Sequence, residues 1–183
     1  MDLSSINKVY FIGIGGIGMS ALANYFLQKN ICVYGYDREA SSITENLKNL
    51  GSNIIYNYND FNVNEFKSNI DNVLVIYTPA ISKEHPLLTK FKENEFNVLK
   101  RAEVLQKISE NSKCIAVAGT HGKTTTSAIL AHILKVSDLK FSAFVGGIMV
   151  NYNSNFLYNG EDYILVEADE FDRSFLKLNP NYA

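Results

Sequence analysis

The chain has 183 residues, of which 46% are hydrophobic and 20% are charged, a composition typical of a globular protein with one domain or two small ones. A formal net charge of −2 gives no reason to expect nucleic acid or an anionic membrane surface as a partner. No apolar run approaches the roughly 18 residues that cross a bilayer, and the first residues, MDLSSINK, lack the pattern of a signal peptide.

The first part of the chain alternates between short apolar runs and segments with helical spacing. The apolar runs predict strands at 8–14, 31–37, 53–56, 72–78 and 97–100. Helices are predicted at 18–30, 42–50, 86–94 and 101–109. Ser42 and Glu45 suggest a capping box for the second helix, which ends at Gly51. This alternation predicts an α/β fold in which helices cover both faces of a parallel sheet.

A glycine-rich turn, GIGGIG, follows the first predicted strand. Gly13, Gly15 and Gly18 match the pattern G-x-G-x-x-G, in which missing side chains let the backbone approach a diphosphate at a helix N-terminus. Asp37 ends the next strand roughly 20 positions later, where an acid accepts a ribose hydroxyl. The turn predicts a nucleotide diphosphate site. It does not choose between NAD and another nucleotide, and a tight turn without a ligand is the alternative.

The two cysteines, Cys32 and Cys114, each lie in an apolar run that predicts a strand. Buried cysteines behave as small hydrophobic residues, and disulfides are rare in reducing compartments. We therefore expect two buried thiols in a cytoplasmic protein rather than a disulfide.

Residues 110–113, ENSK, are the best linker candidate, and a second unit begins after them. Strands are predicted at 114–119, 141–147 and 163–170, with a helix from Lys123 to Lys135. A nucleotide-binding α/β sheet normally has about five strands, and an incomplete sheet leaves an apolar face and an open edge uncovered. We therefore expect a fragment of a longer protein, divided into residues 1–110 and 111–183.

A second glycine loop, GTHGKTTT at 119–126, lies between a strand and a helix. Its backbone N–H groups can surround a phosphate chain, with Lys123 reaching the terminal phosphates and the Thr124 hydroxyl binding Mg²⁺. Val117 stands where the usual loop of an NTPase has glycine. We expect the His121 side chain only to shape the turn. A turn that binds nothing is the alternative.

Acidic side chains gather where the last predicted strand ends, in VEADEFD at 166–172. In an open α/β sheet this end of a strand faces the ligand crevice, so a carboxylate there can complete the Mg²⁺ site. Alternation along the strand places Glu167 and Asp169 on one face, whereas Glu170 and Asp172 also suit the start of a helix. Glu167 is the predicted metal ligand and Asp169 is the second choice.

Five motifs together resemble the Mur ligase family, and they cover essentially the whole chain. They are GIGGIGMS (13–20), TPAIS (78–82), KRAEVL (100–105), GTHGKTTT (119–126) and EADEFDRSFLKLNP (167–180). In this family the ATP loop needs no earlier glycine, so the resemblance accounts for Val117. Ala21 and Phe171 depart from residues that are frequent in the family, and neither departure removes a phosphate or metal ligand.

The resemblance implies three domains in the whole protein. A Rossmann-like parallel-sheet domain for a UDP-sugar corresponds to residues 1–110. The beginning of a P-loop-type α/β ATPase domain corresponds to residues 111–183. A C-terminal domain for the amino acid, and further metal ligands, would lie beyond residue 183.

The resemblance also implies an ATP-dependent ligase that joins L-alanine to the lactyl carboxylate of UDP-N-acetylmuramate during peptidoglycan precursor synthesis, with this chain inactive by itself. Lys123 would be catalytic, and Thr124 and Glu167 would hold Mg²⁺. The implied ATP-binding residues are Gly119, Thr120, His121, Gly122, Lys123, Thr124 and Thr125. The implied UDP-sugar-binding residues are Gly15, Gly16, Ile17, Gly18, Asp37, Thr78, Pro79 and Ala80.

Three other functions remain open on the sequence. A related ligase attaches a preformed tripeptide to the same sugar during wall recycling. A dehydrogenase would bind NAD at GIGGIG, but it would leave GTHGKTTT and VEADE unexplained. A non-catalytic nucleotide-binding module would need only the two loops.

Overall fold

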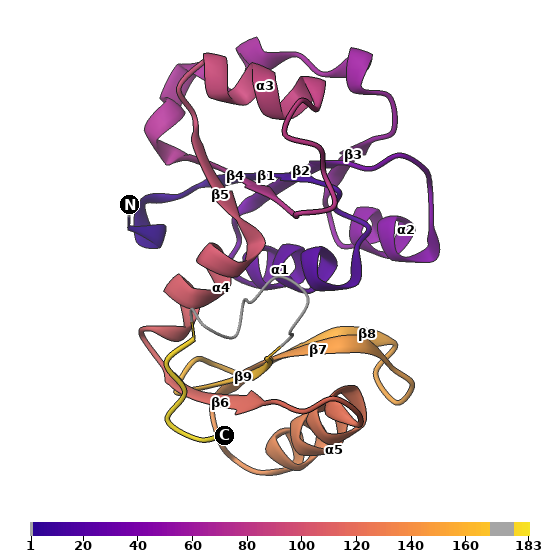
Figure 1. Ribbon diagram of the computed structural model, residues 1–183, viewed down its shortest axis with the longest axis vertical. Coiled ribbons are helices and arrows are strands. Elements are labelled where there is room, and N and C mark those ends of the chain that lie inside the picture. Colours follow the sequence, from indigo (N-terminus) through magenta and orange to yellow (C-terminus); the bar gives the residue numbers. More distant parts are fainter. Residues whose placement is uncertain (1, 169–177) are drawn as a thin grey trace. The chain divides into compact units, whose positions relative to one another are not determined.

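The computed structural model describes residues 2–168 and 178–183. The chain forms two compact units, Met1–Arg101 and Ala102–Ala183 (Figure 1). Each unit has one sheet, and the predicted α/β class is confirmed. Among the described residues no helix has the length and apolar character needed to cross a membrane.

The first unit contains a five-stranded sheet that is parallel throughout, as predicted. Its strand order is β3-β2-β1-β4-β5. The strands are β1 (Lys8–Ile12), β2 (Cys32–Tyr36), β3 (Asn53–Ile55), β4 (Val73–Tyr77) and β5 (Asn97–Lys100). The helices are α1 (Ile17–Gln28), α2 (Ser42–Asn49) and α3 (Pro86–Glu93), while α4 (Arg101–Ser109) follows β5.

Helices cover both faces of this sheet, with α1 and α2 on one side and α3 on the other (Figure 1). The connection from β3 to β4 contains three short 3-10 helices, Tyr58–Asp60, Val63–Glu65 and Lys67–Asn72, in place of an α-helix. This connection supplies aromatic side chains to the core beside α3. A buried cluster of rings results, which includes Tyr10, Phe61, Phe66, Phe91 and Phe96.

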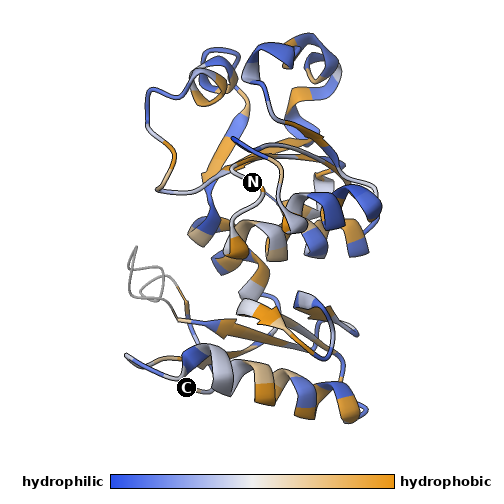
Figure 2. Ribbon diagram, turned by 90° about the vertical axis from the view of Figure 1, so that its right-hand side faces the viewer, coloured by the Kyte–Doolittle hydropathy of each residue, from blue (hydrophilic) through white to orange (hydrophobic). Residues whose placement is uncertain are grey.

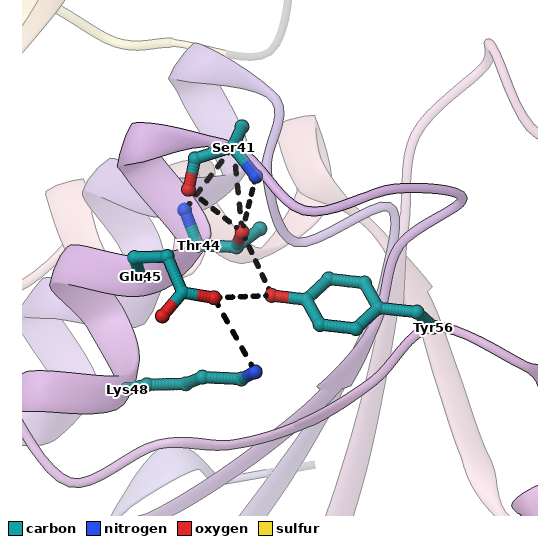
Figure 3. Close-up of polar contacts among 5 residues, drawn as sticks. All are labelled: Ser41, Thr44, Glu45, Lys48 and Tyr56. Carbon is teal, nitrogen blue, oxygen red and sulfur yellow. Dashed lines mark hydrogen bonds and ion pairs between the residues drawn. The ribbon is translucent and has the colours of Figure 1, made fainter.

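The N-terminal cap of α2 lies one residue earlier than the sequence predicted. Ser41, not Ser42, is the N-cap residue, and its hydroxyl accepts a hydrogen bond from the Thr44 N–H at 3.2 Å. Thr44, not Glu45, completes the capping box by accepting from the Ser41 N–H at 2.8 Å. Glu45 accepts a hydrogen bond from the Tyr56 hydroxyl at 3.1 Å (Figure 3). A serine at 41 and another at 42 make the register of the cap ambiguous from sequence alone.

The prediction that both cysteines are buried is wrong for Cys32. Cys114 is buried, and burial raises the pKa of its thiol, but Cys32 is exposed. Cys32 is the first residue of β2 and pairs with Lys8, the first residue of β1. Both thiols are free.

The second unit has a four-stranded sheet in the order β6-β9-β7-β8, flanked by α5 (Lys123–Val136). Its strands are β6 (Lys113–Val117), β7 (Phe141–Met149), β8 (Ser154–Tyr158) and β9 (Tyr163–Glu167). The first three neighbours are parallel, whereas β8 pairs antiparallel with β7. The strand β8 was not predicted from the sequence, because the short run SNFLY follows the asparagines of the preceding turn.

One side of α5 packs on the sheet and the other is exposed. Ala131 and Leu134 are buried in a core with Phe141 and Leu165. On the outer side, apolar side chains stay accessible, and Figure 2 shows apolar colour along this helix. They are Ile129, Ile133 and Val136, with exposed fractions of 58%, 53% and 71%.

Candidate functional site

The loop GTHGKTTT connects β6 to α5 in the second unit. Both of its glycines have positive φ angles, +133° at Gly119 and +78° at Gly122, a backbone region that residues with side chains rarely adopt. Gly122 is the N-cap of α5, so the helix N-terminus with its N–H groups opens directly on the loop. The loop is exposed, as a phosphate-binding loop must be.

Lys123, the predicted catalytic residue, is the first residue of α5 and is half-buried. Its ammonium group donates a hydrogen bond to the Gly119 carbonyl oxygen at 2.6 Å. The lysine thus lies across its own loop. A phosphate bound there would take over this contact, since an ammonium group bonds more strongly to a charged oxygen than to a carbonyl.

The two predicted metal ligands, Thr124 and Glu167, come together. The Thr124 hydroxyl at the start of α5 donates to Oε2 of Glu167 at 3.1 Å, and Glu167 is the last residue of β9. The other carboxylate oxygen, Oε1, accepts from the Ser127 hydroxyl at 2.5 Å and from the Gly146 N–H at 2.8 Å. Three elements, α5, β7 and β9, therefore fix this carboxylate.

Ser127 and the glycine pair of β7 are site residues that the sequence reasoning missed. At Gly146 an added Cβ would overlap Oε2 of Glu167, and at Gly147 it would lie 3.0 Å from Cγ2 of Thr124. Both positions therefore leave room for the side chains opposite. The Gly-Gly pair in the sequence indicates a place where another group approaches the backbone closely. The sequence does not show that these groups are Thr124 and Glu167, because they are far from the pair along the chain.

The donor set suits Mg²⁺. A hydroxyl and a carboxylate are hard oxygen ligands, and Mg²⁺ is commonly held by one or two such groups while waters and substrate phosphates fill its other positions. Within 2–168 and 178–183, no cluster of three or more His, Cys, Asp or Glu side chains is found that could enclose a metal. The second-choice ligand Asp169, with Glu170, Phe171 and Asp172, lies outside the described residues.

The first glycine turn connects β1 to α1 in the first unit. Gly13 has a φ of +87°, and Gly16 is the N-cap of α1, which begins at Ile17. An added Cβ at Gly18 would overlap the guanidinium group of Arg101. The turn thus leaves the N-terminus of a 12-residue helix at its end, the arrangement that binds diphosphates in other folds.

Asp37 lies against this turn, one residue past the end of β2. Its Oδ2 accepts a hydrogen bond from the Gly15 N–H at 2.7 Å, and its Oδ1 accepts from the Arg38 N–H at 2.7 Å. An added Cβ at Gly15 would lie 2.9 Å from Oδ2 and 3.0 Å from Cγ2 of Thr44. Gly15 therefore gives its N–H to Asp37, while the carboxylate keeps lone pairs for a hydroxyl donor.

The predicted residues at 78–80 follow β4 and form a turn closed by the Ile81 N–H donating to the Thr78 carbonyl at 3.0 Å. Cγ2 of Thr78 lies 3.5 Å from the position of a Cβ built on Gly13, so this turn and the glycine turn are neighbours. Pro79 and Ala80 are exposed. The structure thus brings residues from the ends of β1, β2 and β4 to one edge of the first sheet.

Three aromatic rings at the same edge were not anticipated. The ring of Tyr36, the last residue of β2, lies 5.2 Å from that of His85, and Tyr58 lies 6.3 Å from His85. Tyr58 is 39% exposed. Burial lowers the pKa of His85, which favours the neutral imidazole. No spacing rule in the sequence connects these residues, because three different segments supply them.

Comparison with known proteins identifies the family. Residues 8–113 match the family described as "Mur ligase family, catalytic domain". The chain is 52% identical, over all of its length, to the UDP-N-acetylmuramate–L-alanine ligase of Flavobacterium psychrophilum, of which it covers 41%. The curated relatives that it matches are much longer, and the chain spans about 40% of their length.

Solved structures share the fold. A UDP-N-acetylmuramate-alanine ligase from Thermotoga maritima aligns with 96% of this chain and 40% of its own at a TM-score of 0.82 and 32% identity. A UDP-N-acetylmuramate:L-alanyl-gamma-D-glutamyl-meso-diaminopimelate ligase from Neisseria meningitides also has a TM-score of 0.82. Its identity is 22%, with 97% of this chain and 59% of that one covered, so it supports the fold alone. With a family match over more than half of its residues, the chain belongs to the Mur ligase family.

Proposed function

We propose that the whole protein to which this chain belongs joins L-alanine to the lactyl carboxylate of UDP-N-acetylmuramate in an ATP-dependent reaction of peptidoglycan precursor synthesis. One observation carries the proposal: the 52% identity, along the full chain, to a ligase named for these two substrates. ATP and a nucleotide sugar are intracellular metabolites, so the proposal includes a cytoplasmic location.

The chemistry explains why such an enzyme needs a phosphoryl donor. A carboxylate is a poor electrophile, so it must be activated before an amine can attack it. Transfer of the γ-phosphoryl group of ATP to the carboxylate gives an acyl phosphate and ADP. The amine of L-alanine then attacks the acyl carbon and loses a proton, and inorganic phosphate leaves as the amide forms.

The second unit supplies the groups for the donor in this proposal. The backbone N–H groups of residues 119–125 surround the phosphate chain, and Lys123 offsets charge on the transferring phosphoryl group. Thr124 and Glu167 hold Mg²⁺, which neutralises charge on the phosphate oxygens when it is bound. The hydrogen bond between these two side chains supports their assignment to one site.

The first unit supplies the groups for the acceptor. The turn at Gly15, Gly16, Ile17 and Gly18 holds the UDP diphosphate at the N-terminus of α1. Asp37 accepts a ribose hydroxyl, and Thr78, Pro79 and Ala80 lie beside the nucleoside. The contact of Asp37 with the Gly15 N–H supports this division, since it holds the carboxylate next to the diphosphate turn.

The experiment is a product assay with the full-length protein. ATP is supplied with UDP-N-acetylmuramate and either L-alanine or the tripeptide L-alanyl-γ-D-glutamyl-meso-diaminopimelate, and the nucleotide product is identified by mass. Amide formation with L-alanine supports the proposal. Preference for the tripeptide identifies the recycling ligase instead, and binding of NAD in place of the UDP-sugar, measured by calorimetry, contradicts both.

Lys123→Ala in the full-length protein tests the role of the loop. We expect alanine-dependent phosphate release to fall by at least about 100-fold, because the substitution removes the cation that offsets transition-state charge. The affinity for UDP-N-acetylmuramate, measured by calorimetry, should stay unchanged. Turnover close to that of the unmodified protein would contradict the role given to Lys123.

A further inference from the structure

Ser127 lies one helical turn after Lys123 on the inner side of α5, and its exposed fraction is 0%. Its hydroxyl lies 2.5 Å from Oε1 of Glu167, a residue 40 positions further along the chain. Water cannot reach a group at this depth, so the hydroxyl must take its hydrogen-bond partners from the protein.

The hydroxyl has one hydrogen and, within the part of the chain that the structure describes, three candidate acceptors. Besides Oε1 of Glu167, the carbonyl oxygens of Lys123 and Thr124 lie at 2.6 Å and 3.4 Å. A hydrogen bond from a hydroxyl to a carboxylate is shorter and about twice as strong as one to a neutral acceptor. Because the carboxylate is the stronger acceptor, we assign the hydroxyl hydrogen to the bond with Oε1 of Glu167. The Lys123 carbonyl already accepts the N–H of the residue four positions later in the helix.

This assignment fixes the direction of the carboxylate. Among the residues that the structure describes, Oε1 accepts hydrogen bonds from the Ser127 hydroxyl and the Gly146 N–H, whereas Oε2 accepts one from the Thr124 hydroxyl. Oε1, which accepts two hydrogen bonds, is held by the interior of the unit. Oε2 faces Thr124 of the phosphate loop. A carboxylate held by only one backbone donor could rotate and exchange its two oxygens.

We propose that Ser127 is a positioning residue for Glu167, which it orients so that Oε2 and the Thr124 hydroxyl face the same cation. The inference rests on the proposed use of ATP and Mg²⁺ at this loop. It concerns a fully buried residue that acts through Glu167. It gives Ser127 a function beyond the common one of a helix serine that bonds to the carbonyl four residues earlier.

Ser127→Ala in the full-length protein is the test, with Ser142→Ala as the matched control. Ser142 is a serine of the same unit, 1% exposed, whose hydroxyl donates to the Gly160 carbonyl at 2.9 Å. It therefore reports the cost of removing a buried hydroxyl that does not touch Glu167. The probe is Mn²⁺, whose binding in the presence of a non-hydrolysable ATP analogue is followed by electron paramagnetic resonance.

We expect Ser127→Ala to weaken Mn²⁺ binding by about tenfold or more, the usual effect of losing a group that orients a metal ligand. The Mg²⁺ concentration that gives half-maximal activity should rise in parallel, while the KM for UDP-N-acetylmuramate should not change. Ser127→Thr keeps the hydroxyl and should restore binding. Should the added methyl prevent folding, Ser127→Cys, with a weaker donor, is expected to give an intermediate affinity.

Mn²⁺ binding by Ser127→Ala equal to that of the unmodified protein would overturn the inference, as would an equal loss in Ser142→Ala. The two proposals fail separately. An unmodified protein that makes no alanine adduct, with Mn²⁺ binding still dependent on Ser127, would reject the proposed substrates and keep the positioning role. A protein that makes the alanine adduct, but whose Mn²⁺ binding does not change in Ser127→Ala, would keep the proposed substrates and reject the positioning role.

Discussion

The position of the Glu167 carboxylate depends on two small residues, Gly146 and Ser127, because a larger side chain at position 146 would not fit beside it and the Ser127 hydroxyl donates to it. Gly146 gives the carboxylate an N–H group, and the absence of a side chain at that position leaves space for Oε2. Ser127 is short enough to reach Oε1 from within the first turns of α5. A larger side chain at position 146 would displace the end of the Glu167 side chain rather than backbone, so substitutions here should affect the site more than the fold.

Gly146→Ala is expected to reduce ATP-dependent activity of the full-length protein by about tenfold or more, since the new methyl displaces a carboxylate that three hydrogen bonds hold. Stability should change little, because the end of the Glu167 side chain can move aside. The measurements are ADP release and thermal unfolding.

Gly51→Ala is the control, for which we expect a loss of stability and no loss of activity. Gly51 has a φ of +104° and no atom within 4 Å of an added Cβ, so alanine there strains only the backbone. That strain should lower the unfolding free energy by about 1–2 kcal/mol and leave activity unchanged. Loss of stability without loss of activity in Gly146→Ala would contradict the account of the site.

At the level of elements, α3 shows how a histidine can act as a helix cap. Nδ1 of His85, the N-cap residue, accepts a hydrogen bond from the Leu87 N–H at 3.3 Å, and Pro86 occupies the first helical position. Proline suits this position because its missing N–H would have no helical acceptor. The interaction requires Nδ1 to be unprotonated, and burial beside Tyr36 favours that neutral form.

A pH dependence of stability follows from the lowered pKa of His85. The unfolded chain binds the proton with an ordinary pKa of about 6.5. The stabilisation is therefore present above that value and is lost as the pH falls through the lower pKa of the folded state. His85→Asn keeps a capping side chain that does not titrate. Urea unfolding between pH 7.5 and 5 should show a smaller loss of stability in His85→Asn, and equal losses would contradict this role.

Elements were largely predictable because their signals are local. The apolar runs of the first unit predicted all five strands, and the Lys123 helix was expected to end one residue before it does. The predictions were wrong where two neighbouring residues could both cap a helix, or where contacts with distant segments determine the burial or pairing of a residue. Ser41 and Ser42 could each cap α2, and Cys32 could not be recognised as exposed at a strand start. The antiparallel strand β8 lacked a strong pattern and depends on β7 for its place.

At the level of the whole molecule, the outer side of α5 exposes large apolar side chains. Ile129 and Ile133 are exposed by more than half, and the chain spans about 40% of its relatives' length. The sheet of the second unit has four strands, one more than the sequence predicted. The exposed isoleucines lie on the helix that flanks this sheet, so they do not test the prediction that an incomplete sheet leaves its own apolar face uncovered.

Substitution of Ile129 and Ile133 by glutamine in this chain should leave its unfolding free energy within about 0.5 kcal/mol for each change, because neither side chain is in the core. Binding of a hydrophobic dye and self-association in sedimentation should both decrease. Leu134→Ala, at a position only 5% exposed, should instead cost about 2–5 kcal/mol. A destabilisation by the glutamines comparable to that of Leu134→Ala would show that this side of α5 is packed.

The sequence by itself determined the two glycine turns, the lysine and threonine of the phosphate loop, the acid at the end of β9 and the α/β class. Each depends on spacing within one turn or one strand, and such spacing is visible along the chain. Only the tertiary structure decided which groups meet Glu167, because Gly146 and Ser127 reach it from 21 and 40 positions away. A hydrogen bond between distant segments depends on how strands pair and helices pack, and no local pattern encodes it.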